Sequence, residues 1–262
     1  MADVDRLVAM DETFIMFHMT NKMLLVPTGT KRVGSVNPID DEKKGVTLAV
    51  ACEVYSSMLL PPFIVDTGEF GAKLMHDWHH YKKSVVVFNA THWMTQYIFT
   101  IFLAWLKTLF KGDKIGVVVD RSRTHYGDVV DTWLKSKEGQ DIVVEFIAEG
   151  MTSVHQVGDI AINRPLKAMI RSKYNLLRWK SRESLRPGDV YRIDRAELVG
   201  IIEDSYDEMN KENVKDQWIA RAFETCGQHP MRTMSTAFDD HLKSLQENHI
   251  YANMLSSSAQ LK

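Results

Sequence analysis

The sequence predicts an α/β fold built on a mixed sheet, and three observations lead to that prediction. The run Ile115–Asp120 is apolar until it ends on a carboxylate, which is typical of a strand buried on both faces of a sheet. Between residues 94 and 147 the pattern alternates helix, strand, helix and strand, an order that favours parallel neighbours. Several short strand patterns within the first 65 residues indicate an antiparallel part. We therefore expect helices to flank one mixed sheet.

The first half of the chain predicts strands that follow one another closely. They cover residues 4–10, 14–19, 23–26, 46–55 and 62–65. The second and third flank the polar Thr20-Asn21-Lys22, as in a hairpin. The first ends where Asp11-Glu12-Thr13 begins, so Asp11 stands at a predicted strand end, as Asp120 does.

Two amphipathic helices are predicted on either side of the strand that ends at Asp120. Over residues 94–111, apolar side chains recur at steps of four, three and four, which is the period of a helix with one buried face. Residues 126–135 predict a second helix, and residues 142–147 a further strand. The side chains expected to point inward from the two helices are Ile98, Phe102, Trp105, Leu109, Val129, Val130, Trp133 and Leu134.

A long basic helix is predicted after Asp159, with Asn163 as its N-cap and Pro165 in its first turn. Residues 164–186 carry eight Lys or Arg and a single acid, Glu183. Beyond a break near Pro187, residues 196–209 and 214–225 predict a helical appendage, and residues 253–262 a frayed or disordered tail. The expected organisation is one α/β domain over residues 1–182 and a helical C-terminal extension over residues 183–262.

Composition narrows the classes of function. With 262 residues, 45% of them hydrophobic, the chain can bury a full core. Because 32 Lys and Arg balance 34 Asp and Glu, any nucleic-acid contact must be local. Cys52 and Cys226 form neither a disulfide nor a zinc pattern, and no apolar run is long enough to span a bilayer. We expect an intracellular, soluble protein that has no membrane partner.

Three aspartates at element ends, Asp11, Asp120 and Asp159, raise the question of a metal site. Carboxylates are the ligands that Mg²⁺ prefers, and two metal ions held by carboxylates can cleave phosphodiesters. Each aspartate also has an ordinary alternative, because such residues often cap helices, start turns or favour a helix dipole. The segment His76–His80 is a weaker metal candidate, since neighbouring histidines on a polar loop are more often solvated.

Four motifs in one order favour the metal alternative. They are Asp11-Glu12-Thr13 after a strand, His92-Trp93-Met94-Thr95 before a helix, Val117–Asp120 with His125 five residues on, and the run Thr152–Lys167. In this order they resemble the DDE superfamily endonuclease domain of pogo-type transposases, a group that includes centromere protein B and jerky-like domesticated relatives. The resemblance covers about residues 4–182.

This resemblance implies a ribonuclease-H-like fold and a catalytic triad of Asp11, Asp120 and Asp159 that binds two Mg²⁺ or Mn²⁺ ions. It implies DNA as the partner, cleavage of a phosphodiester followed by strand transfer, action in the nucleus, and a homodimer as an open option. His125 is expected to orient a metal ligand or to contact DNA. The residues expected to bind nucleic acid are Arg121, Arg123, His125, Arg164, Lys167, Arg171 and Arg178.

The chain also departs from the family pattern. Arg121 follows the second aspartate where the family has a small or amide residue, and its charge can contact phosphate or repel a metal ion. Val157-Gly158 replaces the usual proline before Asp159, which is expected to loosen the approach to that residue. The family's helix-turn-helix region would precede Met1. The alternative is therefore a catalytically decayed or domesticated binding or interaction module with the same fold.

Overall fold

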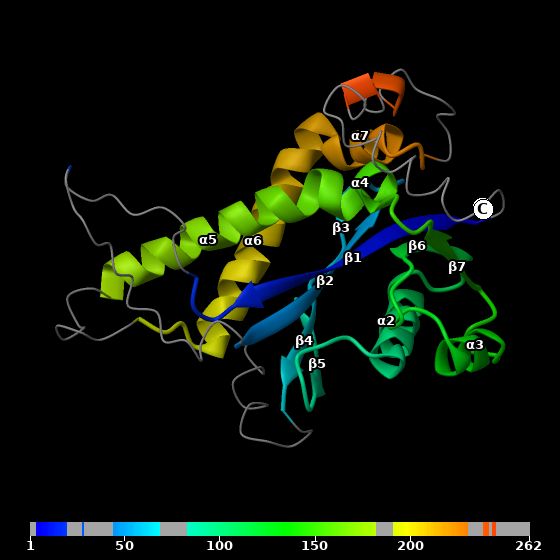
Figure 1. Cartoon of the computed structure of the whole chain (residues 1–262), viewed down its shortest axis with the longest axis horizontal. Helices are drawn as coiled ribbons and strands as arrows, with labels where there is room; N and C mark the ends of the chain where they lie inside the picture. The colour runs from blue at the N-terminus through cyan, green and yellow to red at the C-terminus, as the bar shows by residue number, and fades with distance from the viewer. Residues whose placement is uncertain are drawn as a thin grey trace.

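A seven-stranded mixed sheet runs through the centre of the computed structural model (Figure 1). The structure describes residues 4–19, 28, 44–68, 83–181, 191–229, 238–240 and 243–244. The strand order is β5-β4-β2-β1-β6-β7, and β3 pairs with β2 off this path. The strands are β1 (Arg6–Met16), β2 (Gly45–Glu53), β3 (Met58–Leu59), β4 (Phe63–Thr67), β5 (Val85–Asn89), β6 (Ile115–Asp120) and β7 (Ile142–Ile147).

The strand directions make this a ribonuclease-H-like sheet. β2 is antiparallel to its neighbours β1, β3 and β4, whereas β1, β6 and β7 run parallel to one another, as do β4 and β5. Among β4, β2, β1, β6 and β7, in that order, only β2 is therefore reversed. The predicted mixed sheet and the fold that the resemblance implied are both confirmed.

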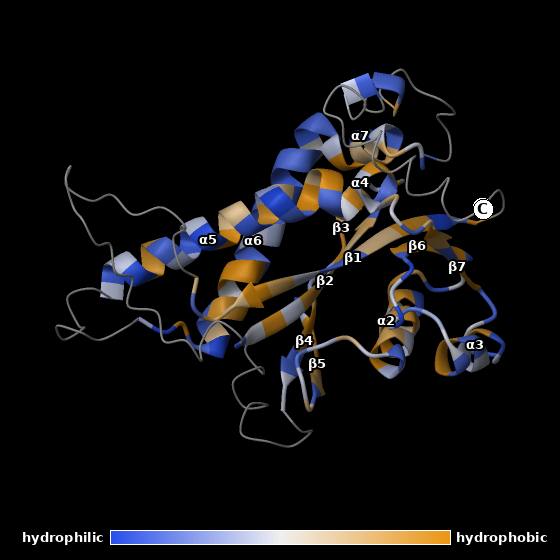
Figure 2. Ribbon diagram, in the orientation of Figure 1, coloured by the Kyte–Doolittle hydropathy of each residue, from blue (hydrophilic) through white to orange (hydrophobic). Residues whose placement is uncertain are grey.

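Helices cover both faces of the sheet (Figure 1). α2 (Gln96–Leu109) and α3 (Asp128–Leu134) share one hydrophobic cluster with the sheet, and α5 (Asn163–Lys180), α6 (Arg195–Asp216) and α7 (Trp218–Thr225) share the other. A short helix, α4 (Thr152–His155), leads towards α5. The central strands are mostly hydrophobic, whereas hydrophilic residues recur along α5 (Figure 2).

Most predicted elements are present, and the largest error concerns β1. That strand continues to Met16, so residues 14–19 are not the first arm of a hairpin. Asp11 pairs with Val50 and Thr13 with Leu48, because the ladder satisfies the backbone whatever the side-chain polarity. β5 is a strand that was not predicted, although Val-Val-Val-Phe is typical of one. The predictions for residues 23–26, His76–His80 and 253–262 lie outside the described residues.

Two side chains expected to point inward are exposed instead. Val129 is 47% exposed and Leu109 39% exposed, whereas Val130 and Phe102 are buried. A helix that covers a sheet buries only the stripe that faces it, so residues at the side of that stripe remain in solvent.

The C-terminal helices are tied to the sheet. α6 and α7 contribute buried side chains to the same hydrophobic cluster as β1 and β2. The side chain of Asn210 on α6 also exchanges hydrogen bonds with the backbone of Leu59 in β3, at 2.8 and 3.1 Å. The predicted domain boundary falls among residues 182–190, outside the described part, and stays a prediction.

Cys52 and Cys226 are both free and buried. Among the residues that the structure describes, no helix has the length and apolar character needed to cross a membrane.

Candidate active site

Asp11 and Asp120 lie side by side on neighbouring parallel strands. Ala9 of β1 pairs with Val118 of β6, and each aspartate stands two residues further along its strand. Because side chains alternate across a sheet, both carboxylates lie on the same face. That face is the one covered by α5, since Ala9 and Val118 belong to the hydrophobic cluster of that helix.

Asp159 approaches this pair on a short π-helical turn, η1 (Gly158–Ile162), that runs into α5. Such turns recur at functional sites. Gly158 touches Asp11 so closely that a Cβ atom on it would lie 2.5 Å from the Cβ of Asp11. Gly158 was expected to loosen the approach to Asp159; it instead permits a close one, which any larger residue would prevent.

Amide groups hold both oxygens of Asp11. Asn163 Nδ2 donates to Asp11 Oδ2 and lies 3.4 Å from Asp159 Oδ1, so one nitrogen bridges the two carboxylates. Gln156 Nε2 donates to Asp11 Oδ1, which also accepts from the backbone N–H of Glu12 at 2.9 Å. These donors are neutral, so they orient the carboxylate without cancelling its charge.

The electrostatics of Asp11 reflect this crowding. Burial and the charge of Asp159 raise the pKa of Asp11, as the charge of Asp120 does to a smaller extent. The hydrogen bonds from Asn163 and from the Glu12 backbone oppose the rise, and the pKa of Asp11 stands at about 7. The charges of the other two aspartates thus act on Asp11.

His125 holds Asp120 from the other side. Its Nδ1 lies 2.8 Å from Asp120 Oδ1, and its Nε2 lies 2.8 Å from Glu12 Oε1. Burial lowers the pKa of His125, but the hydrogen bonds with Asp120 and Glu12 outweigh it and raise that pKa to about 9. His125 is only 2% exposed and its ring lies 4.7 Å from that of Phe99. Of its two predicted roles, orienting a ligand fits this position, and a direct DNA contact does not.

The other residues expected to bind nucleic acid lie in two places. Arg121 and Arg123 are exposed on the loop after β6, where the Arg121 guanidinium stands 5.6 Å from the ring centre of Tyr126. The rest lie along α5: Arg164 and Arg178 are exposed, and Lys167 and Arg171 are half-buried. Burial lowers the pKa of Lys167, and the charges of Asp11 and Asp159 oppose this.

The donor set fits a divalent cation between Asp11 and Asp159. Hard oxygen ligands suit Mg²⁺ and Mn²⁺, and the hydrogen-bond donors to Asp11 are neutral, so they do not cancel the charge of its carboxylate. In the described part of the chain, however, no three Asp, Glu, His or Cys side chains stand close enough to hold a metal ion together. A cation at this pair therefore needs a further oxygen from another residue type.

Asn163 and Gln156 are site residues that the sequence did not reveal. The predicted cap role of Asn163 is wrong, because the N-cap of α5 is Ile162 and no side chain caps the helix there. The spacing held a signal: Asn163 follows Asp159 by four residues, which places both on one face of a helical turn. Gln156 belongs to the motif run that carried the resemblance.

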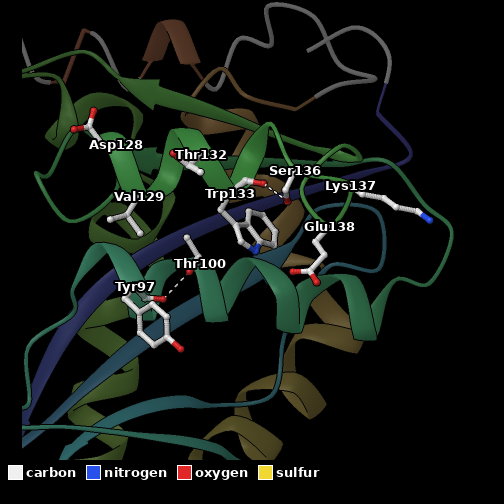
Figure 3. A pocket seen from close by; sticks show the side chains of 9 residues that line it. All are labelled: Tyr97, Thr100, Asp128, Val129, Thr132, Trp133, Ser136, Lys137 and Glu138. Atoms are coloured by element: carbon white, nitrogen blue, oxygen red, sulfur yellow. Dashed lines mark hydrogen bonds between the residues drawn. The ribbon is translucent and has the colours of Figure 1, made fainter.

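A separate hollow of about 710 Å³ lies between α2 and α3 (Figure 3). Tyr97 and Thr100 line it from α2, and Val129 and Trp133 line it from α3. None of the three aspartates lines this pocket, so it is distinct from the carboxylate site.

Comparisons with known proteins assign the family. The model of the DDE superfamily endonuclease matches residues 43–222, a range that contains Asp120 and Asp159 but not Asp11. No curated protein matches the chain in sequence.

Among solved structures, the Mos1 strand transfer complex is 15% identical, with a TM-score of 0.49 over 91% of this chain and 55% of that chain. The Mos1 transposase paired-end complex with left transposon end is 14% identical, with a TM-score of 0.47 over 91% and 56%. The catalytic domain of Mos1 mariner transposase is 15% identical, with a TM-score of 0.39 over 90% and 82%. This chain thus spans little more than half the length of the transposase chains in the two complexes. The family model covers more than half of the chain, which therefore belongs to the DDE superfamily endonuclease family.

Proposed function

We propose that this chain is a metal-dependent DNA endonuclease and strand-transfer domain derived from a pogo-type transposon. The observation that carries the proposal is the position of Asp11: it lies beside Asp120 on the neighbouring parallel strand, and the charge of Asp159 on a helical turn acts on it. Family membership supports the reaction class, and solved transposase complexes with DNA, including one with Mn, support DNA and a divalent ion as partners. The four motifs of the sequence support the pogo assignment.

Asp11 and Asp159 would hold a divalent cation, and Asp120 would complete the site for a second one. Bound Mg²⁺ or Mn²⁺ ions supply an activated water and stabilise the leaving oxygen of a phosphodiester. His125 keeps Asp120 in place, and Glu12 fixes His125 in turn. The positive charges of Lys167 and the α5 arginines would bind the DNA backbone beside the carboxylates.

A nicking assay on supercoiled plasmid tests the catalytic part. Wild type is expected to nick DNA in Mg²⁺ or Mn²⁺ but not in EDTA. Asp120→Ala and Asp159→Ala should reduce nicking to background, because each removes a metal-binding carboxylate. Asp204→Asn, which changes an exposed aspartate on α6, is the matched control and should nick like wild type. Equal activity in wild type and Asp120→Ala would remove Asp120 from the catalytic group.

One observation favours the alternative of a decayed or domesticated binding module. No group of three metal-ligating side chains of the Asp, Glu, His or Cys type stands together in the described residues. A decayed protein should keep its fold and bind DNA while it neither nicks plasmid nor binds Mn²⁺. Titration calorimetry with Mn²⁺ therefore separates the two functions.

DNA binding through α5 can be tested by salt titration. Charge reversal in Arg171→Glu and Arg178→Glu should flatten the dependence of affinity on salt, by about 0.9 in logarithmic slope for each lost phosphate contact. Loss of affinity with an unchanged slope would assign the contact to another surface.

We also propose action in the nucleus, where chromosomal DNA lies, and assembly as a homodimer. A fluorescent fusion tests the first, and sedimentation velocity with and without DNA tests the second.

A further inference from the structure

Asn163 lies at the centre of the carboxylate site. Its Nδ2 is within hydrogen-bonding distance of Asp11 Oδ2 and of Asp159 Oδ1. A cation shared by these two carboxylates would bind next to this nitrogen, within about 2.0 to 2.6 Å of the same carboxylate oxygens. The amide group of Asn163 thus points to where a cation would bind.

The other end of that amide has no partner. Asn163 is 8% exposed, and its Oδ1 is buried without a hydrogen bond to any of the described residues. An unsatisfied buried carbonyl costs about 1 to 3 kcal/mol, so native proteins rarely retain one without a reason. Helix capping is not the reason, because the N-cap of α5 is Ile162.

The chemistry of an amide explains why Nδ2 faces the carboxylates while Oδ1 has no partner. Towards two bare carboxylates it must present its NH₂ group, since its oxygen would repel theirs. With a cation between the carboxylates the preference reverses, because an Asn carbonyl is a ligand for hard cations and an NH₂ group is not. Rotation about the Cβ–Cγ bond exchanges the two ends without moving the backbone.

We propose that Asn163 is a metal ligand of this site: its amide donates to Asp11 and Asp159 in the metal-free protein and turns its Oδ1 to the cation when one binds. The proposal rests on the metal-dependent function proposed above. It also supplies the third oxygen donor that the acidic residues lack around Asp11 and Asp159. Gln156 remains a hydrogen-bond donor to Asp11 in both states.

The test measures metal binding by the full chain, not activity. Titration calorimetry with Mn²⁺ gives the affinity, and Tb³⁺ luminescence lifetimes in H₂O and D₂O give the number of water molecules on the bound ion. Asn163→Ala should weaken Mn²⁺ binding by at least about tenfold, and the bound Tb³⁺ should gain one water. Asn163→Asp keeps an oxygen donor, so it should bind Mn²⁺ at least as tightly as wild type with no extra water. Asn175→Ala, on the same helix, is the control and should match wild type in both measurements.

The outcomes separate this proposal from the proposed function. If wild type binds no Mn²⁺, the metal-dependent function fails and the role of Asn163 fails with it. If wild type binds Mn²⁺, Asp159→Asn loses it and Asn163→Ala keeps it with no added water, the function stands and Asn163 is only a hydrogen-bond donor. Should Asn163→Ala not fold, weaker binding by Asn163→Asp than by wild type overturns the proposal by itself.

Discussion

Asp66 and Asp11 are two carboxylates on the same sheet, the first buried and the second half-buried, with opposite surroundings. Asp66, at 0% side-chain exposure, receives a charged hydrogen bond from Arg195 Nε at 2.8 Å and one from the backbone N–H of Thr67 at 2.7 Å. Burial raises the pKa of Asp66, and Arg195 opposes the rise. Asp11 receives only neutral donors and faces two further acids, Asp159 and Asp120.

The difference separates a structural ion pair from the candidate active site. At Asp66 the protein supplies its own counter-charge, and the pair fastens α6 to β4. At Asp11 the hydrogen-bond donors are all neutral, and no Lys or Arg side chain of the described residues forms an ion pair with it. A bound cation would supply the counter-charge there, as Arg195 does for Asp66.

The free energy of unfolding of the metal-free protein should depend on pH, because ionised Asp11 destabilises the fold. The pKa of Asp11 is about 7 in the folded chain, against an ordinary 3.8. Between these two pH values the folded state therefore keeps a proton on Asp11 that the unfolded state has lost. The stability contribution of Asp11 is therefore complete below about pH 4 and is lost as the pH rises through 7. Asp11→Asn should be more stable than wild type by roughly 4 kcal/mol at pH 8 in EDTA, and equally stable near pH 4. Urea denaturation at both pH values checks the sign, and a variant less stable than wild type at pH 8 would refute it.

The next largest expected effect comes from breaking the structural pair. Arg195→Met should lower the free energy of unfolding by about 3 kcal/mol, because it leaves Asp66 buried and charged without its counter-ion. Urea denaturation measures this. Lys83→Met, which breaks the exposed ion pair with Asp207, is the control and should have a much smaller effect. Equal losses in the two variants would contradict a special role for the Asp66 pair.

A bound metal ion should stabilise the folded protein through Asp11 and Asp159, and not through the ion pair of Asp66. At a Mn²⁺ concentration about 100 times its Kd, the gain is about 2.7 kcal/mol, or roughly 5 to 10 °C in Tm. Differential scanning fluorimetry should record this rise in wild type, and EDTA should reverse it. Asp11→Asn and Asp159→Asn should lose the rise, whereas Arg195→Met should keep it on its lower baseline. A rise of equal size in Asp11→Asn would place the ion elsewhere.

The smallest effect concerns Lys167, a cation of α5 on which the charges of Asp11 and Asp159 act. Lys167 responds to the charges of Asp11 and Asp159, yet it does not hydrogen-bond to either in the way Arg195 does to Asp66. If Lys167 binds phosphate instead, Lys167→Gln should reduce the logarithmic salt slope of DNA binding by about 1. Lys83→Gln makes the same charge change away from the site and should leave the slope unchanged. An unaltered slope in Lys167→Gln would remove it from the DNA contact.

Most of the elements and the three candidate acids follow from the sequence alone. β6 follows from an apolar run that only a sheet buried on both faces accommodates, and α5 from its amphipathic period. The order of the motifs identified Asp11, Asp120 and Asp159 as one candidate group. Each stands where an element of regular structure was predicted to begin or end.

The surroundings of those acids depend on how distant elements pack together. The sequence predicted Asn163 as a helix cap, but the close approach of η1 to β1 over Gly158 turns its amide to Asp11 instead. The ion pair of Arg195 with Asp66 joins residues 129 positions apart, and the hydrogen bond of His125 with Glu12 joins residues 113 apart. Local periodicity is set by neighbours within a few residues, whereas such contacts depend on how whole elements pack, and this is why no pattern along the chain predicted them.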